Sequence, residues 1–149
     1  MIKEKKAKKS DSILEYGLKE IQISKFSLNE IKEVNLEEDE IYMNLELSGD
    51  IVDEKNLVQI ETSIIMSKVI SEKMKKIAEL KVIYFYEISN LRDLRENGDT
   101  YLPKNLINTL NAISISTTRG ILFTKFQGTK VQKFILPLID PTKFKINNL

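Results

Sequence analysis

The chain has 149 residues, 42% of them hydrophobic and 30% charged, with a formal net charge of +1, which indicates a single globular domain with a sizeable core. Cysteine and histidine are both absent, which excludes disulfides, zinc sites with thiolate or imidazole ligands, and nucleophilic catalysis by Ser–His or Cys–His pairs. Because no phosphate-binding glycine motif and no membrane-spanning apolar stretch occurs, we expect a cytoplasmic protein that has no cofactor and is not an enzyme.

The chain opens with a basic segment. Residues 1–10 contain five lysines and one glutamate, an excess of four positive charges. Such an arm can bind nucleic acid through the phosphates, but no arginine or aromatic residue is interleaved to contact a base. We therefore expect residues 1–12 to be a disordered, solvated tail and residues 13–149 to form one domain, with nucleic-acid binding as the less favoured alternative.

Alternating apolar residues predict four strands. In the first strand the apolar positions change phase between Ile23 and Phe26, which is typical of a β-bulge. A glycine inside the second strand, Gly49, predicts another bulge or bend. The predicted strands cover residues 13–31, 41–51, 57–69 and 77–88, and the predicted turns lie at 37–40, 53–56 and 71–76.

A helix is predicted from Pro103 to Gly128. Apolar residues recur at steps of three and four, Pro103 suits the first helical turn, and Gly128 is the expected stop, with Asp99 or Thr100 as the cap. Residues 113–118 alternate and are rich in β-branched side chains, so a strand is the alternative there. The first apolar face comprises Leu106, Leu110, Ile113, Thr117 and Ile121; a second stripe, Ala112, Ile115, Arg119, Leu122 and Phe126, requires its own cover, from a partner subunit or a client.

Together these elements predict an α+β fold, in which one long C-terminal helix packs on a four-stranded antiparallel sheet. The opposite face of the sheet also retains apolar residues, which a second subunit would cover. We therefore expect a homo-oligomer, and a monomer with scattered surface apolar residues is the alternative. The interface candidates are Ile65, Val69, Ile83, Phe85 and Arg119.

The C-terminal third resembles the SecB-type export chaperones. Thr-Thr-Arg119-Gly precedes Gly128-Thr129, and Pro137 follows Gly128 by nine residues, within Leu-Pro-Leu-Ile-Asp. The alternating approach of Val131, Phe134 and Leu136 to that proline is also similar to the family pattern. The order of four strands and a helix over residues 14–144 matches as well.

This resemblance implies a fold and a mechanism. SecB-like chaperones hold unfolded chains in apolar grooves between sheet and helix without hydrolysing ATP, and assemble as dimers or tetramers. For this chain the resemblance implies unfolded or partly folded polypeptides as partners, with an export ATPase or an antitoxin as further partners, and a loop at 90–98 bordering the groove. The groove candidates are Tyr84, Tyr86, Leu91, Tyr101, Phe123, Phe126 and Phe134, and packing in the core is the alternative role for each.

Two departures from the family pattern bear on function. Pro-Leu-Ile-Asp stands in place of Pro-Val-Asn-Phe, and only five residues follow Phe144, so the family's second C-terminal helix is expected to be shortened or lost. General protein transport is therefore less expected than service to one dedicated client, such as an antitoxin. The alternative from another class is a structural protein that uses the same fold to assemble with one fixed partner.

Overall fold

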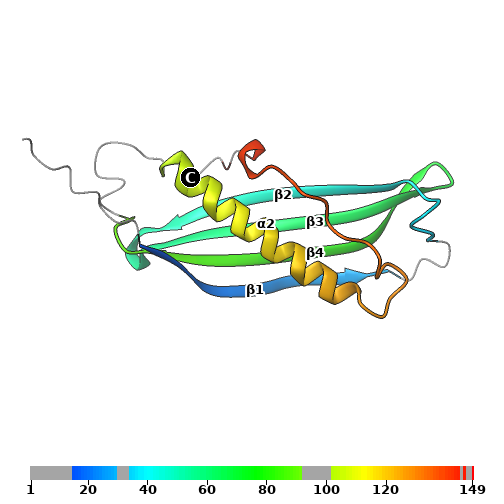
Figure 1. The fold of residues 1–149 in the computed structure, drawn as a ribbon, viewed down its shortest axis with the longest axis horizontal. Helices are drawn as coiled ribbons and strands as arrows, with labels where there is room; N and C mark the ends of the chain where they lie inside the picture. The colour runs from blue at the N-terminus through cyan, green and yellow to red at the C-terminus, as the bar shows by residue number, and fades with distance from the viewer. Residues whose placement is uncertain (1–14, 30–33, 92–101, 145, 147–148) are drawn as a thin grey trace, which may run out of the picture.

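The computed structural model describes residues 15–29, 34–91, 102–144, 146 and 149 (Figure 1). Within these residues, four antiparallel strands form a sheet in the order β1-β4-β3-β2, and a long helix crosses one face of it. This arrangement confirms the predicted α+β fold. The elements are β1 Tyr16–Leu28, β2 Ile41–Val52, β3 Leu57–Ile70, β4 Lys73–Ile88 and α2 Lys104–Phe126, with short 3-10 turns η1 Asp53–Lys55 and η2 Pro141–Lys143.

Strand β1 is irregular, as the change of phase in its sequence predicts. Its register with β4 shifts between Ile23 and Lys25, and a second shift, which was not predicted, lies between Leu18 and Glu20. Each shift re-aims the side chains that follow it. The helix side of β1 therefore carries Leu18, Ile21, Ile23 and Phe26, which pair with Tyr86, Tyr84, Val82 and Leu80.

The prediction of a bulge or bend at Gly49 is wrong. Strand β2 pairs with β3 in unbroken register along its length, and Gly49 lies directly opposite Ile60. The glycine serves close packing instead, because a Cβ there would lie 2.6 Å from Leu149 Cδ1 and 2.8 Å from Ile146 Cγ2. A glycine inside a strand can mark the close approach of another part of the chain, and here that part is the C-terminal segment.

The turn between β3 and β4 is shorter than predicted. Only Ser71 and Glu72 turn, with φ values of 51° and 63°, and Lys73 already pairs with Ile70. Two consecutive residues with positive φ form the tight hairpin turn whose twist matches that of the flanking strands. The polar residues expected in this turn, 73–76, instead form the exposed start of β4. The turns predicted at 37–40 and 53–56 are confirmed.

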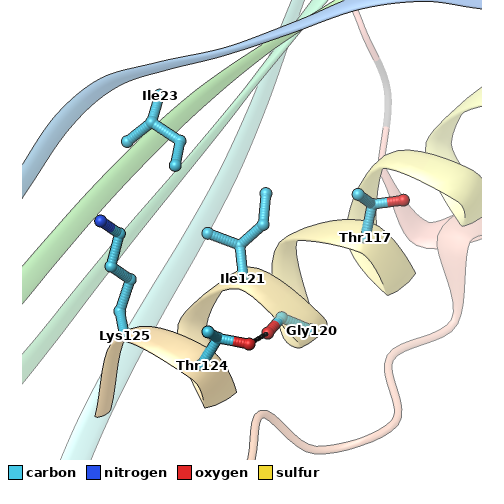
Figure 2. Close-up of a pocket in the computed structure, with 6 residues that line it drawn as sticks. All are labelled: Ile23, Thr117, Gly120, Ile121, Thr124 and Lys125. Carbon is cyan, nitrogen blue, oxygen red and sulfur yellow. Dashed lines mark hydrogen bonds between the residues drawn. The ribbon is translucent and has the colours of Figure 1, made fainter. Parts of the chain in front are cut away.

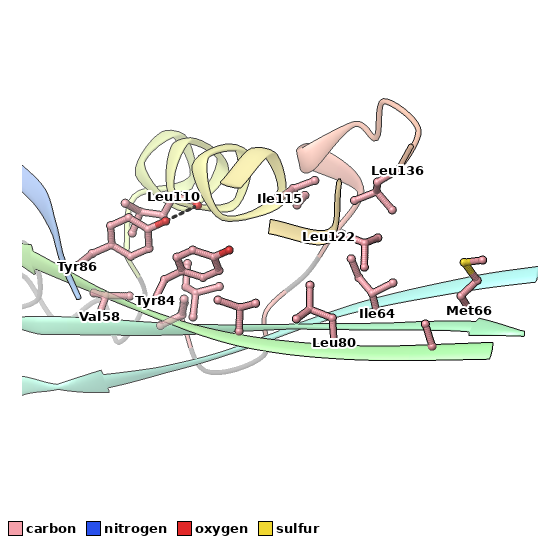
Figure 3. Close-up of a cluster of buried hydrophobic side chains, with 14 of the residues drawn as sticks. Val58, Ile64, Met66, Leu80, Tyr84, Tyr86, Leu110, Ile115, Leu122 and Leu136 are labelled. Carbon is pink, nitrogen blue, oxygen red and sulfur yellow. Dashed lines mark hydrogen bonds between the residues drawn. The ribbon is translucent and has the colours of Figure 1, made fainter. Parts of the chain in front are cut away.

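The hydrophobic core lies between the sheet and α2 (Figure 3). Its sheet half comes from the even-numbered residues of β3 and β4, and burying each large apolar side chain contributes about 1.5–3 kcal/mol. The buried apolar residues of the sheet include Val58, Ile60, Ile64, Met66, Leu80, Val82, Tyr84 and Tyr86, and those of the helix include Leu106, Leu110, Ile115, Leu122 and Phe126.

Residues 113–118 are helical, so the predicted helix is confirmed in spite of the β-branched content. The hydroxyl groups of Ser114 and Thr118 are buried and hydrogen-bonded to the sheet. Thr118 shares hydrogen bonds with Tyr84 (2.6 Å) and Thr62 (2.7 Å), and Ser114 shares one with Tyr86 (2.7 Å). Burial raises the pKa of Tyr84, and that of Tyr86 to about 12, so both phenols stay protonated and neutral. Contacts with the sheet therefore outweigh local propensity.

Residues 129–144, which we call the strap, cover the second apolar stripe of α2. Arg119 in the helix holds the strap by donating from Nε to the Leu136 carbonyl (2.9 Å) and from Nη2 to the Pro137 carbonyl (3.1 Å). Phe134 of the strap packs edge-on against Phe126 of the helix, with ring centres 6.1 Å apart. The chain itself, rather than a partner subunit or a client, thus provides the second cover.

Candidate functional site

Helix α2 divides its face of the sheet into two flanks (Figure 1). On one flank the strap returns from the end of the helix toward β2. On the other flank lies β1, and no part of the described chain returns over it in the same way. This asymmetry leaves the β1 side of the helix-bearing face open.

The open flank exposes a row of apolar side chains on β1. Leu18, Ile21 and Ile23 are 40%, 42% and 45% exposed, and Tyr16 at the start of the strand is 41% exposed. These residues lie on the same face as the buried core, because each pairs with a buried residue of β4. Contiguous apolar surface of this kind commonly marks a site of interaction with another chain.

A cavity of about 470 Å³ lies where this row meets α2 (Figure 2). Ile121 projects from the helix toward Ile23 of β1, and the Thr124 hydroxyl donates back to the Gly120 carbonyl at 2.9 Å. Apart from its chain neighbours and the local helix backbone, no atom lies within 4 Å of the place that a Cβ on Gly120 would occupy, so the glycine leaves the wall open. The lining residues are Ile23, Thr117, Gly120, Ile121, Thr124 and Lys125.

Strand β1 is also an edge of the sheet. It pairs with β4 on one side, and no residue of the described ranges pairs with it on the other. The N–H and C=O groups on such an edge are available to a further strand. At the end of the cavity Lys125 places Nζ 5.4 Å from the centre of the Phe26 ring, so one positive charge borders an otherwise apolar surface. We call this combined surface the α2–β1 groove.

Most of the predicted groove residues lie elsewhere. Tyr84, Tyr86, Leu91 and Phe126 are each 0% exposed and belong to the core, so a ligand cannot touch them unless the packing around them opens. Phe134 is half-buried against Phe126. Phe123 is 44% exposed but does not line the cavity. Tyr101 and most of the loop at 90–98 lie outside the described residues.

The predicted interface residues occupy three places. Ile65, Ile83 and Phe85 lie half-buried on the sheet face opposite α2, where Ile65 pairs with Glu79 and Phe85 with Gln59. Val69 is 45% exposed near the β3–β4 hairpin. Arg119 binds the strap of its own chain.

The sequence analysis did not identify the residues that line the α2–β1 groove. Ile21, Ile23 and Ile121 were recognised as members of a strand and a helix, but nothing in their spacing says that they face each other. One feature of the sequence could have indicated the groove. The first predicted strand carries more apolar residues than an edge strand with a solvated face needs.

The described part of the chain contains no group of three acidic, cysteine or histidine side chains placed to bind a metal ion. In that same part, no helix has the length and apolar content that crossing a membrane requires.

No protein-family model matches the sequence, and no curated protein matches it either. Among solved structures, the chain is similar to the SecB-like chaperone Rv1957 of Mycobacterium tuberculosis, in complex with a ChAD peptide from the Rv1956 HigA1 antitoxin. The similarity has a TM-score of 0.54 and covers 83% of this chain and 90% of that chain, at 7% sequence identity. An identity this low shows the fold alone. The chain thus has the SecB-like fold that its sequence resemblance predicted.

Proposed function

We propose that this protein is an ATP-independent, SecB-like chaperone that holds unfolded or partly folded polypeptide in the α2–β1 groove. The observation that carries the proposal is the row of β1 side chains, each 40–45% exposed, on the core-facing side of an edge strand. Such a surface offers an extended client two kinds of contact at once. Apolar side chains of the client would lie against Leu18, Ile21 and Ile23, and its backbone would pair with the edge of β1.

The groove provides binding energy without a chemical step. Removing apolar surface from water contributes roughly 25 cal/mol per Å², so a few hundred Å² of client and groove contributes several kcal/mol before the cost of ordering the client. Contacts with single segments would therefore be weak. Several segments of one client, bound to several copies of the protein, would add through multivalency.

The proposed partners are polypeptides, and an antitoxin is the proposed dedicated client. The structural neighbour Rv1957 is described in complex with an antitoxin peptide, which supports a polypeptide partner for a protein with this fold. An export ATPase remains a second proposed partner.

Filling the groove tests the proposal. Gly120→Leu begins a side chain in open space beside Ile121, so it should fill the cavity. We expect the wild-type protein to suppress aggregation of a chemically denatured model client at stoichiometric amounts, measured by light scattering. The variant should need roughly tenfold more protein for the same effect, which corresponds to about 1.4 kcal/mol of lost binding.

Ser116→Leu is the matched control, because it adds the same side chain to the same helix at an exposed position that does not line the cavity. It should suppress aggregation as the wild type does. Equal suppression by Gly120→Leu and Ser116→Leu would show that clients bind elsewhere. No suppression by the wild type with several unrelated clients would contradict a general holdase.

A second candidate function rests on the opposite face of the sheet. Its half-buried Ile65, Ile83 and Phe85 suit a flat contact with one folded partner or with a second copy. A structural protein of this kind would give one stoichiometric partner in a pull-down and no suppression of aggregation.

A further inference from the structure

Strands β3 and β4 project beyond their neighbours at the hairpin that joins them. The pairing of β2 with β3 ends at Lys68, and the pairing of β1 with β4 ends at Ala78. Residues 69–76, which we call the hairpin tip, therefore have no further strand beside them within the described ranges. In Figure 1 this hairpin extends past the ends of α2 and β1.

The hairpin tip carries apolar side chains that the fold does not bury. Val69 and Met74 are directly paired across the two strands and are 45% and 59% exposed. The buried, helix-facing residues of β3 are even-numbered, so this pair points to the opposite side, away from α2. Tyr42 of β2, which is 42% exposed, pairs with Ser67 and thus lies diagonally across from Val69 on the same side. A ribbon of two strands has no core to which such side chains could contribute.

The same tip is positively charged. It contains three lysines and one glutamate, Glu72, an excess of two positive charges. Lys76 is bonded to Glu79 of its own strand. Lys73 and Lys75 are both exposed, and neither forms an ion pair with an acidic side chain of the described ranges. The tip therefore presents two uncompensated ammonium groups beside its apolar pair.

The acidic turn before β2, residues 37–40, offsets only part of this charge. Within that turn, Asp39 is bound by Lys68 at 2.7 Å, and Glu37 lies 3.8 Å from Lys133 of the strap. Glu40 accepts a hydrogen bond from the Tyr42 hydroxyl, which raises the pKa of that phenol. These carboxylates have partners within the protein, whereas the lysines at the end of the hairpin have none among the described residues.

We propose that the hairpin tip is a docking site for an anionic lipid surface. Val69 and Met74 would enter the interfacial layer of the bilayer, and the lysines beside them would contact the phosphates, because a long lysine side chain keeps its charge in the polar layer. Tyr42 suits the same boundary, since its ring is apolar and its hydroxyl polar. Apolar insertion and electrostatic attraction are each weak alone, and the two together hold a protein at a membrane.

Two other occupants fit this surface less well. A second copy of the chain would bring equal positive charges together in a self-complementary contact. A nucleic acid would bind the lysines through its phosphates but would leave Val69 and Met74 without a partner. A lipid surface uses both features. Because the apolar pair points away from α2, the α2–β1 groove would stay accessible in the docked protein, and the inference does not depend on the proposed function.

Co-sedimentation with lipid vesicles tests the proposal. The probes are vesicles of phosphatidylcholine alone and vesicles in which about one third of the lipid is phosphatidylglycerol. We expect the wild type to bind the anionic vesicles at least roughly tenfold more tightly than the neutral ones, and less tightly as salt is added. Val69→Ser with Met74→Ser should weaken binding to anionic vesicles roughly tenfold, because the inserted apolar surface is lost. Lys73→Gln with Lys75→Gln should weaken it to a similar extent and leave binding to neutral vesicles unchanged.

The strap offers matched controls. Ile135→Ser with Leu138→Ser removes two apolar side chains that are 59% and 91% exposed, and Lys130→Gln with Lys133→Gln removes two exposed charges. Both double variants should bind as the wild type does. The lysine-rich segment 1–10 is present in every variant, so it cannot cause a difference between them. Equal binding by the tip variants and the strap variants would overturn the proposal.

A fluorescent label shows whether the tip enters the bilayer. The chain has no cysteine, so Met74→Cys provides a single thiol for an environment-sensitive fluorophore. We expect its emission to rise when anionic vesicles are added, and to be quenched by a nitroxide on the lipid acyl chains. The same label at Leu138→Cys should show neither change. An unquenched label at position 74 in the vesicle-bound protein would contradict insertion.

Two further outcomes would assign the tip to another partner and overturn the proposal. One is binding of a duplex oligonucleotide that depends on Lys73 and Lys75, with no vesicle binding. The other is a lower mass in solution for Val69→Ser with Met74→Ser than for the wild type, measured by light scattering, with vesicle binding unchanged.

Discussion

At the scale of single residues, the buried amide of Asn111 is the least satisfied group in the described core. The residue is 0% exposed, and neither its side-chain oxygen nor its nitrogen has a hydrogen-bond partner. Leaving a buried polar group without a partner costs about 1–3 kcal/mol. It lies one helical turn before Ile115, among the buried residues of α2.

Replacing this amide should stabilise the protein. We expect Asn111→Leu, which keeps the same number and branching of side-chain heavy atoms, to raise the free energy of unfolding by about 1–2 kcal/mol, because it removes the desolvation penalty. Urea denaturation followed by circular dichroism measures the change. Thr109→Val, at a half-buried position of the same helix, is the control for a general gain in hydrophobicity. A loss of stability in Asn111→Leu would mean that the amide is bonded in solution.

Glu79 links two strands by charge. Its side chain is 5% exposed and accepts hydrogen bonds from Lys76 of its own strand and Lys25 of β1, the latter at 2.9 Å. The Lys76 ammonium, followed by that of Lys25, lowers the pKa of Glu79 from 4.5 to about 2. A carboxyl whose pKa is lower in the folded state stabilises the protein fully above its unfolded value of 4.5, and this contribution disappears as the pH falls through about 2.

The substitution Glu79→Gln should therefore act in a pH-dependent way. At pH 7 we expect it to lower the free energy of unfolding by roughly 1 kcal/mol, a figure kept small because Lys25 and Lys76 are partly solvated. The difference from the wild type should shrink between pH 4.5 and about 2. Glu87→Gln, which breaks an exposed 3.5 Å pair with Lys19, is the control and should change little at any pH. If the difference in the free energy of unfolding stayed constant down to about pH 2, the ionised Glu79 carboxylate would not be the source of the stabilisation.

At the scale of elements, the β3–β4 hairpin is held by a turn that its residues do not favour. Ser71 and Glu72 both adopt positive φ, at 51° and 63°, a conformation for which Asn-Gly is the preferred pair. The strands close the turn because fourteen and sixteen residues of β3 and β4 pair along nearly their whole length.

Correcting the turn chemistry should stabilise the hairpin. We expect Ser71→Asn with Glu72→Gly to raise the free energy of unfolding by about 0.5–1 kcal/mol, since glycine and asparagine adopt positive φ with less strain. Thermal denaturation gives the comparison. Ser71→Val, which is β-branched and disfavours positive φ, should lower the melting temperature instead. A neutral or destabilising effect of the double substitution would show that the turn relaxes in solution.

At the scale of the whole molecule, the two faces of the sheet differ in what covers them. The helix and strap cover one face except along β1, while Ile65, Ile83 and Phe85 on the other are only half-buried by their neighbours. This second face is where we propose that copies of the chain meet. Such a contact would also bring several α2–β1 grooves into one assembly and so increase the affinity for long clients.

A charge placed on that face should separate the copies. We expect the wild type to scatter light as a multiple of 17.2 kDa and Phe85→Glu to scatter as the monomer, because a buried unpaired carboxylate opposes association. Gln59→Glu puts a charge at the position paired with Phe85. It tests whether the contact between copies is centred on the Phe85 ring. A wild-type mass of 17.2 kDa at micromolar concentration would exclude this assembly.

The elements and their faces follow from the sequence because they depend on local periodicity. The alternation in β2, β3 and β4 determines which strand side chains face the helix, and the shift of phase after Ile23 locates a bend. The steps of three and four locate α2 but not all of its buried face, because Ser114 and Thr118 are buried while Thr117 and Ile121 of the predicted face are only half-buried. The length of the turn at Ser71 was predicted wrongly for two reasons. Neither of its two residues is a glycine, and the lysines that follow are polar although they already belong to a paired strand.

The candidate site does not follow from the sequence, because it is made by contacts between distant segments. Aromatic residues such as Tyr84 and Tyr86 seemed suited to a groove, but the helix lies over them and their hydroxyls bond to Thr118 and Ser114. Gly49 seemed to bend a strand, yet it makes room for Leu149, one hundred residues later.

By its own pattern of apolar residues, therefore, the sequence determined four antiparallel strands, one long helix and the buried faces of β3 and β4. Only the tertiary structure decided where α2 crosses the sheet, which flank the strap covers and which flank stays open. The reason is that periodicity records the distance of a residue from its near neighbours, whereas a groove depends on the placement of whole elements, which is set by packing and by hydrogen bonds between residues far apart in the chain.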